Sequence, residues 1–154
     1  MGTWNYNNEN RVLIDYTQLP PALVQALVAT EDVRFYEHAG IDFFALGRAI
    51  VKRGMMGQKS AGGGTTITQQ LAKQLFTERP AHTTLERLLQ KPIEWVIAVE
   101  LERCYTKDEI LTMYLNKFDF LHNAVGIKVA ANTYFKKEPK DLTVVEAATL
   151  VGLC

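Results

Sequence analysis

The sequence predicts a single, mostly α-helical domain. Three segments open with the pattern Thr-x-x-Glu and continue with apolar residues at helical spacing, starting at Thr83, Thr106 and Thr143. Strand-like alternation is confined to residues 11–15, which we expect to form a short edge strand. The 154 residues, of which 47% are hydrophobic and 22% charged, are enough to bury one core.

The helices are predicted from their caps and their periodicity. Proline fits the first turn of a helix, so Pro20-Pro21 predicts the start of a helix over Ala22 to Tyr36. Asp42 predicts the cap of a second helix that ends near Met55. Further helices are expected at about 66–77, 84–103, 107–117, 124–135 and 144–153.

Two segments are predicted to depart from regular helix. Residues 54–64 contain five glycines, which favour a flexible loop because ordering glycine costs backbone entropy. Pro92 lies inside the helix expected at 84–103 and cannot donate a backbone hydrogen bond. We therefore expect the helix to kink or restart at Lys91.

Charge and composition exclude several classes of function. The 17 basic and 17 acidic residues sum to zero, so nothing indicates a nucleic-acid partner. No apolar run reaches the roughly 18 residues that a membrane span needs, and there is no signal peptide, so we expect any anchor to lie outside this chain. Cys104 and Cys154 lack a CxxC or Cys/His pattern, which argues against a metal site and leaves a disulfide between them open.

An acidic cluster marks the first candidate site, in the segment Glu31 to Gly40. Glu31 falls at the C-terminal end of an apolar helix, where the helix dipole disfavours a carboxylate. A function as acid or base would compensate for this placement. The alternative is a solvated helix end at which Asp32 simply pairs with Arg34. His38 is expected to be structural, since the three histidines do not lie at metal-ligand spacing.

A glycine and threonine segment marks the second candidate site. Residues 62–66 read Gly-Gly-Gly-Thr-Thr before a predicted helix, whose N-terminus offers free N–H groups to an anion. Gln69 and Lys73 are four residues apart and share a helix face with that site. The alternative is a flexible linker followed by a threonine cap.

A stripe on one long helix marks the third candidate site. Arg87, Lys91, Glu94, Ala98 and Leu101 are spaced by four, three, four and three residues, so they share one face. A face that begins charged and ends apolar suits the wall of a cleft. The alternative is a surface ion pair between Lys91 and Glu94, which would contribute only about 0.3 kcal/mol.

These segments resemble the peptidoglycan glycosyltransferase domain of glycosyltransferase family 51, found in class A penicillin-binding proteins and monofunctional transglycosylases. The five motifs of that family occur in order over most of the chain. They are EDxxFxxHxG at 31–40, TxxQQxxK at 66–73, KxxExxxAxxLE at 91–102, KxxILxxYLN at 107–116, and Gly126, Ala130, Tyr134 and Phe135. The departures are Gln90, where the family usually has arginine, Pro92, and residues 118–122, where a glycine is usual.

The resemblance implies a lysozyme-like, two-lobed helical fold and the polymerisation of lipid II into β-1,4-linked glycan strands, with release of undecaprenyl pyrophosphate. It implies Glu31 as general base and Glu94 as the second catalytic carboxylate. The substrate-binding residues implied are Asp32, Thr66, Gln69, Gln70, Lys73, Arg87 and Lys91. No cofactor is required and no metal ligand is assigned, although Mg²⁺ or Mn²⁺ near the diphosphate stays open.

The resemblance also implies partners and a location. The apolar segment from Phe43 to Met56, edged by lysine and arginine, would dip into the membrane surface. The expected location is the bacterial inner (cytoplasmic) membrane, with the domain on its outer, periplasmic face. We expect residues 1–154 to be one domain that continues beyond Cys154, with a transpeptidase domain in the full-length protein. The alternatives are a lysozyme-like hydrolase or lytic transglycosylase, which needs no phosphate site, and a non-catalytic glycan-binding module.

Overall fold

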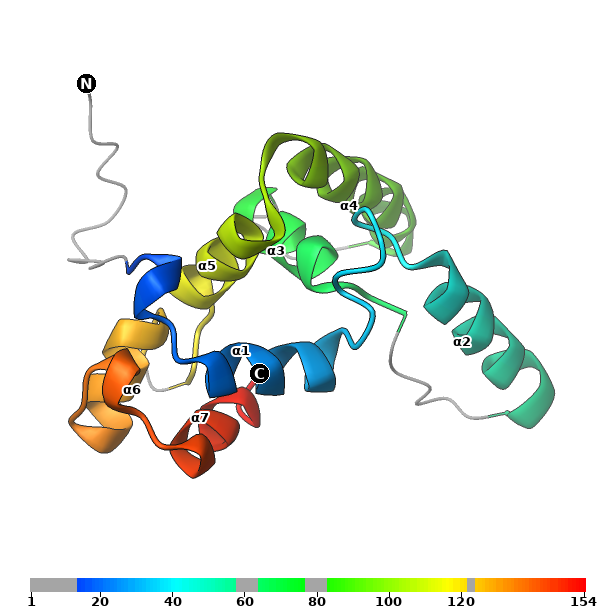
Figure 1. The fold of residues 1–154 in the computed structure, drawn as a ribbon. Helices are drawn as coiled ribbons and strands as arrows, with labels where there is room; N and C mark the ends of the chain where they lie inside the picture. The colour runs from blue at the N-terminus through cyan, green and yellow to red at the C-terminus, as the bar shows by residue number, and fades with distance from the viewer. Residues whose placement is uncertain (1–13, 58–63, 77–82, 122–123) are drawn as a thin grey trace, which may run out of the picture.

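The computed structural model describes residues 14–57, 64–76, 83–121 and 124–154, and within them the fold is helical without a strand (Figure 1). This confirms the predicted mostly α-helical class. The α-helices are α1 (Pro21–Glu31), α2 (Phe43–Met56), α3 (Ile67–Phe76), α4 (Thr84–Cys104), α5 (Lys107–Lys117), α6 (Ile127–Phe135) and α7 (Val144–Val151). Two short 3₁₀ helices are η1 (Tyr16–Gln18) and η2 (Pro139–Asp141).

The three predicted capping boxes are confirmed. The hydroxyl oxygens of Thr83, Thr106 and Thr143 each accept a hydrogen bond, 3.2 Å long, from the backbone N–H three residues later. At each box the glutamate side chain in turn accepts from the threonine N–H. Two free donors at each helix start are thereby satisfied, which fixes where α4, α5 and α7 begin. Asp42 caps α2 as predicted, because its Oδ1 accepts from Ala45 N over 3.0 Å.

The first helix ends earlier than its periodicity suggests. The sequence predicted helix as far as Tyr36, whereas α1 ends at Glu31. Asp32 adopts φ −159° and ψ 77°, outside the helical region. Its carboxylate binds groups far along the chain, so a tertiary interaction overrides local helix preference here.

The predicted edge strand is not found in the part of the chain that the structure describes. Residues 11–13 lie outside that part, and Ile14 is not in a strand. The side chain of Asn116 pairs with Ile14 instead, accepting from its N–H over 3.2 Å and donating to its carbonyl over 3.0 Å. One side-chain amide thus satisfies both backbone groups in the way that a neighbouring strand would.

The long helix α4 continues through Pro92, so it does not restart at Lys91; the other predicted outcome, a kink there, stays a prediction. Pro92 is exposed to solvent, where water can satisfy the carbonyl group that lost its backbone donor. Of the loop expected at 54–64, residues 54–56 form the last turn of α2, and 58–63 lie outside the described residues.

The hydrophobic core lies where α1, α3, α5, α6, α7 and the C-terminal half of α4 meet. Among the described side chains of α2, only Ala45 is buried. Fully buried side chains of this core include Leu23, Leu27, Phe35, Ile67, Leu71, Ile110, Leu111, Tyr114, Leu115, Phe120, Ile127 and Leu150. Figure 1 shows α2 and the N-terminal half of α4 extending away from these packed helices. The candidate site lies where the two parts join.

Candidate active site

A pocket of about 170 Å³ lies between the end of α1, the start of α2 and the start of α3. Its walls bring together residues from the first two predicted sites. The lining residues are Ala29, Thr30, Glu31, Asp32, Val33, Asp42, Ala45, Arg48, Gly64, Thr65 and Thr66. The acidic cluster and the glycine-threonine segment, separated by about thirty residues of sequence, therefore share one cavity.

Asp32 and His38 hold the segment that follows Glu31. Asp32 Oδ2 lies 2.7 Å from His38 Nε2 and accepts a second bond from Ile67 N over 3.1 Å. His38 Nδ1 accepts from Gly40 N over 3.0 Å, so the ring proton is on Nε2. Both side chains are buried, and the histidine is structural as expected. Asp32 lines the pocket while its carboxylate joins the end of α1 to the start of α3.

A second set of contacts fixes the same segment from the side of α5. The ring of Phe35 is fully buried, and its centre lies 4.4 Å from Lys107 Nζ. Lys107 also donates to the His38 carbonyl and to Glu102 Oε1, each over 2.7 Å. Thr68 on α3 donates to the same carboxylate oxygen over 2.7 Å. These charged and aromatic contacts tie the segment that follows Glu31 to α3, α4 and α5.

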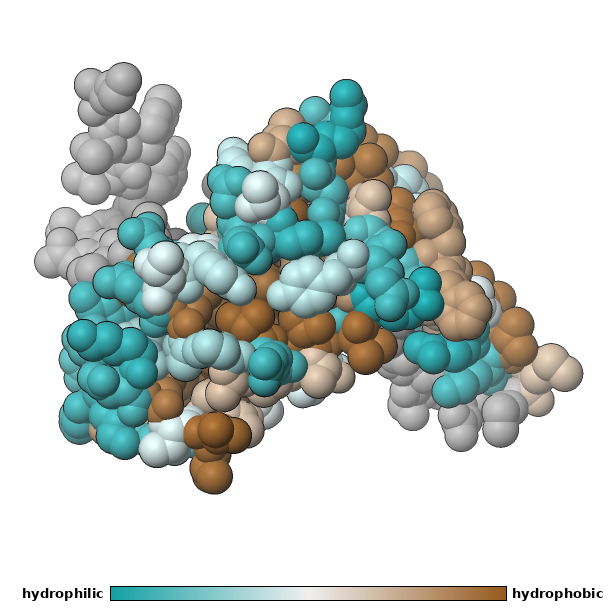
Figure 2. Space-filling view, in the orientation of Figure 1, coloured by the Kyte–Doolittle hydropathy of each residue, from teal (hydrophilic) through white to brown (hydrophobic). Residues whose placement is uncertain are grey.

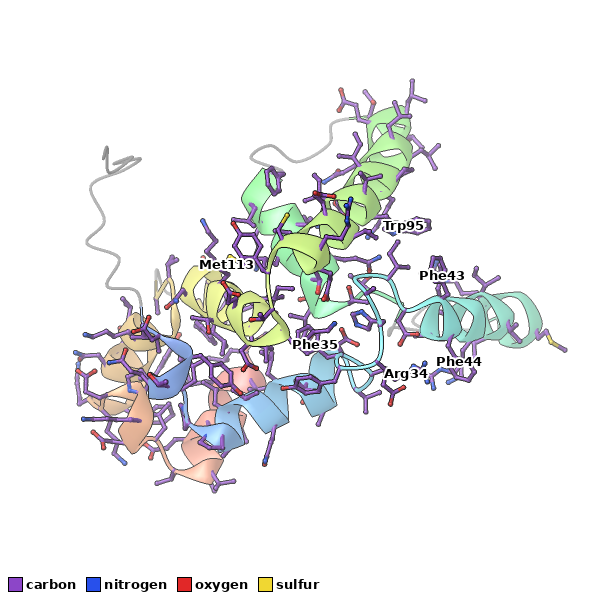
Figure 3. All side chains as sticks on the ribbon, turned by 45° about the horizontal axis from the view of Figure 1, so that its top comes forward. Arg34, Phe35, Phe43, Phe44, Trp95 and Met113 are labelled. Carbon is purple, nitrogen blue, oxygen red and sulfur yellow. The ribbon has the colours of Figure 1, made fainter. Side chains whose placement is uncertain are left out.

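The alternative pairing of Asp32 with Arg34 is not found. Arg34 binds Asp42 Oδ2 over 3.2 Å and Glu37 over 3.3 Å, and its guanidinium lies 4.8 Å from the centre of the Phe44 ring. Figure 3 shows Phe44 on the side of α2 that faces Arg34. Arg34 therefore connects the segment after α1 to the base of α2.

Thr66 and Gln69 cap α3 reciprocally. Thr66 N donates to Gln69 Oε1 over 2.9 Å, and Gln69 N donates to Thr66 Oγ1 over 3.1 Å. Thr66 Oγ1 also donates to the Gly40 carbonyl over 2.7 Å. Both side chains are buried. Thr66 lines the pocket, whereas the Gln69 amide is used inside the protein, and Thr65 is the exposed hydroxyl at this wall.

The catalytic candidate Glu31 is held by one contact. Gln70 Nε2 donates to Glu31 Oε2 over 3.2 Å. Within the described residues Glu31 Oε1 has no hydrogen-bond partner. A half-buried carboxylate with one oxygen held and one oxygen open can accept a proton from a bound hydroxyl group.

Two of the predicted cationic residues, Lys73 and Lys91, are not among the described residues that line this pocket. Lys73 is exposed on α3 and has no ion-pair partner in the described part of the chain. Lys91 Nζ lies 3.5 Å from Glu94 Oε2; the lysine side chain is 58% exposed and the glutamate 5%. The pair predicted as a surface alternative thus exists, but its carboxylate is buried. The side chain of Arg87 lies outside the described part of the structure.

Sequence reasoning missed two residues of this region. Arg48 lines the pocket from α2, where we had counted it only with the basic edge of an apolar segment. Tyr114, which the sequence places in the motif at 107–116 without a role, is fully buried, and its hydroxyl donates to Gln70 Oε1 over 2.9 Å. No periodicity distinguishes a buried tyrosine that packs from one that also orients a neighbour.

The described residues contain no group of three His, Cys, Asp or Glu side chains that could enclose a metal ion. Cys104 and Cys154 are free thiols.

Residues 1–154 match the family model described as Transglycosylase. The chain belongs to the transglycosylase family. This transglycosylase is 46% identical over 145 residues to penicillin-binding protein 1F of Bacillus subtilis (strain 168), covering 94% of the chain and 20% of that protein. It is 41% identical over 148 residues to penicillin-binding protein 1A of Escherichia coli (strain K12), covering 96% of the chain and 17% of that protein.

The similarity reaches beyond these two organisms. Penicillin-binding protein 1A of Aquifex aeolicus (strain VF5) is 39% identical over 145 residues, covering 94% of the chain and 19% of that protein. The chain spans a fifth or less of the length of these relatives. The family resemblance expected from the five motifs is confirmed, and the chain is a glycosyl-transferring domain. Among the helices that the structure describes, none is both long and apolar enough to cross a bilayer.

Proposed function

We propose that this transglycosylase polymerises lipid II into β-1,4-linked glycan strands and releases undecaprenyl pyrophosphate. The observation that carries the proposal is the half-buried Glu31, with one oxygen held by Gln70, in a pocket whose other wall is the hydroxyl-bearing start of α3. A base in a cavity that also admits an anionic leaving group suits glycosyl transfer from a diphosphate.

The reaction is a single displacement at the anomeric carbon of the donor. The acceptor's 4-hydroxyl oxygen forms a bond to that carbon as its proton passes to Glu31 Oε1. The bond from the anomeric carbon to the diphosphate oxygen breaks, and the diphosphate leaves with the electron pair. Removing the proton during attack makes the hydroxyl a competent nucleophile, and a positioned base contributes about 10²–10⁴ in rate.

The leaving diphosphate needs positive charge, and basic residues of α2, α3 and α4 are the candidates to supply it. Arg48 lines the pocket, Lys73 projects from α3, and Lys91 is held beside Glu94 on α4. Arg87, one turn before Lys91 in the sequence, is a further candidate on sequence grounds alone. Cations fixed before the reaction stabilise charge as it develops on the leaving oxygen. Asp32, Thr66 and Gln69 then contribute by shaping the wall that receives the sugar.

We also propose that a divalent cation, Mg²⁺ or Mn²⁺, can bind beside the diphosphate. Magnesium commonly takes one or two protein carboxylates and completes its shell with phosphate oxygens and water. Glu94 is the carboxylate that would hold such an ion here, and its chemistry would be to neutralise the diphosphate.

An apolar surface supports a role at the membrane. Large apolar side chains are exposed on α2, at Phe43, Phe44, Ile50, Val51 and Met55. A second set is exposed on α4, at Leu85, Leu88, Leu89, Ile93 and Val96. Figure 2 shows hydrophobic colouring along both projecting helices. We call these ten residues the apolar face; the side chain of Met56, expected to belong to it, lies outside the described part.

We infer that the apolar face rests on the lipid surface where lipid II presents its diphosphate. Exposed apolar area of this extent on a monomer marks an interaction surface, and basic Lys52 and Arg53 on α2 suit an anionic membrane. This would place the domain on the outer, periplasmic face of the bacterial inner membrane. Because the relatives are penicillin-binding proteins several times longer, we also infer a transpeptidase domain in the full-length protein.

The deciding experiment offers the protein lipid II in one reaction and finished glycan in another. Polymer from lipid II supports the transferase. Shortening of finished glycan would support the hydrolase or lytic alternative, and binding without turnover would support a glycan-binding module. Glu31→Gln serves as the control for catalysis, because it keeps the size of the side chain and removes the base.

A further inference from the structure

We infer that Tyr114 is a positioning residue for Glu31 and acts through the side-chain amide of Gln70. This inference rests on the proposed function, in which Glu31 is the base. It assigns to a core tyrosine a role in catalysis that its burial alone does not suggest.

The three side chains form a continuous chain of hydrogen bonds across three helices. Tyr114 on α5 donates from its hydroxyl to Gln70 Oε1 over 2.9 Å. Gln70 on α3 donates from Nε2 to Oε2 of Glu31, the last residue of α1, over 3.2 Å. No backbone group intervenes, so the orientation of the carboxylate depends directly on the amide and that of the amide on the hydroxyl.

Hydrogen-bond chemistry fixes the direction of this chain. An ionised carboxylate can only accept, so Gln70 must turn Nε2 toward Glu31. Its Oε1 then faces Tyr114, whose hydroxyl must donate. If the amide rotated by half a turn, its oxygen would face the Glu31 oxygen, and two acceptors would meet without a proton. The carboxylate therefore selects the amide orientation, and the Tyr114 hydroxyl holds the amide in that orientation by donating to Oε1.

Tyr114 is well suited to this role because it is itself immobile and remains a donor. Its side chain is fully buried, and its ring lies 5.5 Å from the ring of Phe118 on a tilted plane. Burial raises the pKa of Tyr114 far above its usual range, and the neighbouring Cys154 and Glu31 act in the same direction. The hydroxyl is thus protonated throughout the pH range in which the enzyme would work.

The consequence for catalysis is geometric. With Oε2 held by Gln70, Oε1 is the oxygen left for the proton of the acceptor hydroxyl. Without the tyrosine bond, the amide can rotate and the carboxylate loses its fixed orientation. Misplacing a reacting group by about 1 Å can cost about 10²-fold in rate. Substrate affinity would change little, because Tyr114 does not line the pocket.

The test is Tyr114→Phe, which keeps the buried ring and removes only the hydroxyl. We expect kcat for lipid II polymerisation to fall by about tenfold to 10²-fold, with KM unchanged. The matched control is Tyr134→Phe. The Tyr134 hydroxyl donates to the carbonyls of Phe120 and Leu121, over 2.7 and 3.3 Å. This variant therefore also loses tertiary hydrogen bonding, but none that involves Gln70 or Glu31. Thermal melting of both variants shows whether their stabilities are matched.

A double-mutant cycle tests whether the tyrosine acts through the amide. Gln70→Met removes both bonds at similar volume. If Tyr114 acts only through Gln70, the double variant Gln70→Met, Tyr114→Phe has the kcat of Gln70→Met alone. The inference would be overturned if the double variant lost kcat by the product of the two single losses. It would also be overturned if Tyr114→Phe kept the wild-type kcat or changed only KM. An equal loss of kcat in Tyr134→Phe at matched stability would overturn it as well.

A readout without turnover separates this inference from the proposed function. In protein labelled at glutamine side chains, a nuclear Overhauser effect should connect the Gln70 Nε2 protons with the Glu31 side chain. It should disappear in Tyr114→Phe and persist in Tyr134→Phe. If the wild type fails to polymerise lipid II, the proposed function fails while this signal still decides the hydrogen-bond chain. Persistence of the signal in Tyr114→Phe would overturn the inference.

Discussion

Gly40 lies so close to Ala98 that a Cβ atom added at Gly40 would stand 2.8 Å from the Ala98 carbonyl oxygen. Gly40 also has φ +103°, a conformation that side-chain-bearing residues rarely adopt. The segment after α1 therefore touches the backbone of α4 directly. This contact joins the acidic cluster to the helix that carries Lys91 and Glu94, and only glycine permits it.

Gly40→Ala should destabilise the protein by about 2 kcal/mol or more. The positive φ alone costs about 1–3 kcal/mol for a residue with a Cβ, and the contact with the Ala98 carbonyl adds strain. Urea unfolding followed by circular dichroism measures the loss. Gly47→Ala is the matched control, since a Cβ there meets nothing within 4 Å in the interior of α2. It should stabilise by about 0.5–1 kcal/mol. Equal effects at the two sites would contradict the contact.

Asp32→Ala should destabilise by about 2–5 kcal/mol. It leaves His38 Nε2 and the Ile67 N–H buried without an acceptor, and each orphaned donor costs about 1–3 kcal/mol. Thermal melting provides the measurement. Glu37→Ala is the control, because its pair with Arg34 is exposed and should change stability by no more than about 0.5 kcal/mol. An Asp32 variant as stable as the Glu37 variant would contradict the structural role of the carboxylate.

The helix starts were predictable because caps are local. The pairs Thr83 with Glu86 and Thr106 with Glu109 lie three residues apart, so the sequence contains the whole interaction. The end of α1 was not predictable from periodicity. It depends on Asp32 reaching Ile67, 35 residues away, and no local pattern encodes that partner. The same reason explains Ile14, which Asn116 satisfies from 102 residues away.

The sequence predicted which residues belong to the candidate site, but not which groups each of them contacts. The motif that contains Thr66, Gln69 and Gln70 was recognised as one binding segment. In the structure Thr66 and Gln69 bind each other, whereas Gln70 reaches Glu31. On a helix, adjacent residues point about 100° apart, so two neighbouring glutamines must face different surroundings. Which one faces the base depends on how α3 is rotated in the core.

Val51→Asp should weaken binding to vesicles of anionic phospholipid without changing stability. Val51 belongs to the apolar face and is 55% exposed, so a charge there costs little in water and much at a lipid surface. Vesicle co-sedimentation measures the binding. The matched control is Val145→Asp, where the valine is 75% exposed on α7, a helix that lies apart from α2 and α4 in Figure 1. Equal loss of binding in both variants would argue against the apolar face as the membrane contact.

The two thiols should differ in reactivity at pH 8. Burial raises the pKa of Cys154 to about 12, with the Glu31 carboxylate adding to the shift. The fraction of Cys154 in the reactive thiolate form would then be only about one part in 10⁴ at pH 8. That fraction increases only as the pH rises toward the pKa. Cys104 is exposed and should be alkylated first by iodoacetamide, as mass spectrometry of the digested protein would show. Labelling of Cys154 at an equal rate would contradict its burial.

The roles of Glu31 and Lys73 separate chemistry from binding. Glu31→Gln should reduce lipid II polymerisation by about 10²–10⁴-fold, because the base is lost. Its affinity for a donor-mimicking phosphoglycolipid of the moenomycin type should change little. Lys73→Ala should weaken that ligand by roughly 1.5–3 kcal/mol, because one charge-assisted contact to the diphosphate is lost. Calorimetry and a polymerisation assay on the same variants provide the paired measurement.

Lys91→Ala distinguishes a cation that only binds substrate from one that also supports the fold. Lys91 is the partner that the described residues give to the buried Glu94 carboxylate, whereas Lys73 has no ion-pair partner among them. Both variants should lose phosphoglycolipid affinity, but only Lys91→Ala should also lower the melting temperature, since it leaves a buried charge uncompensated. In the double variant Lys91→Ala, Glu94→Gln an uncharged amide replaces the carboxylate. The stability should therefore recover, while the ligand affinity should not. Recovery of affinity together with stability would show that Lys91 acts by holding Glu94 rather than by contacting the diphosphate.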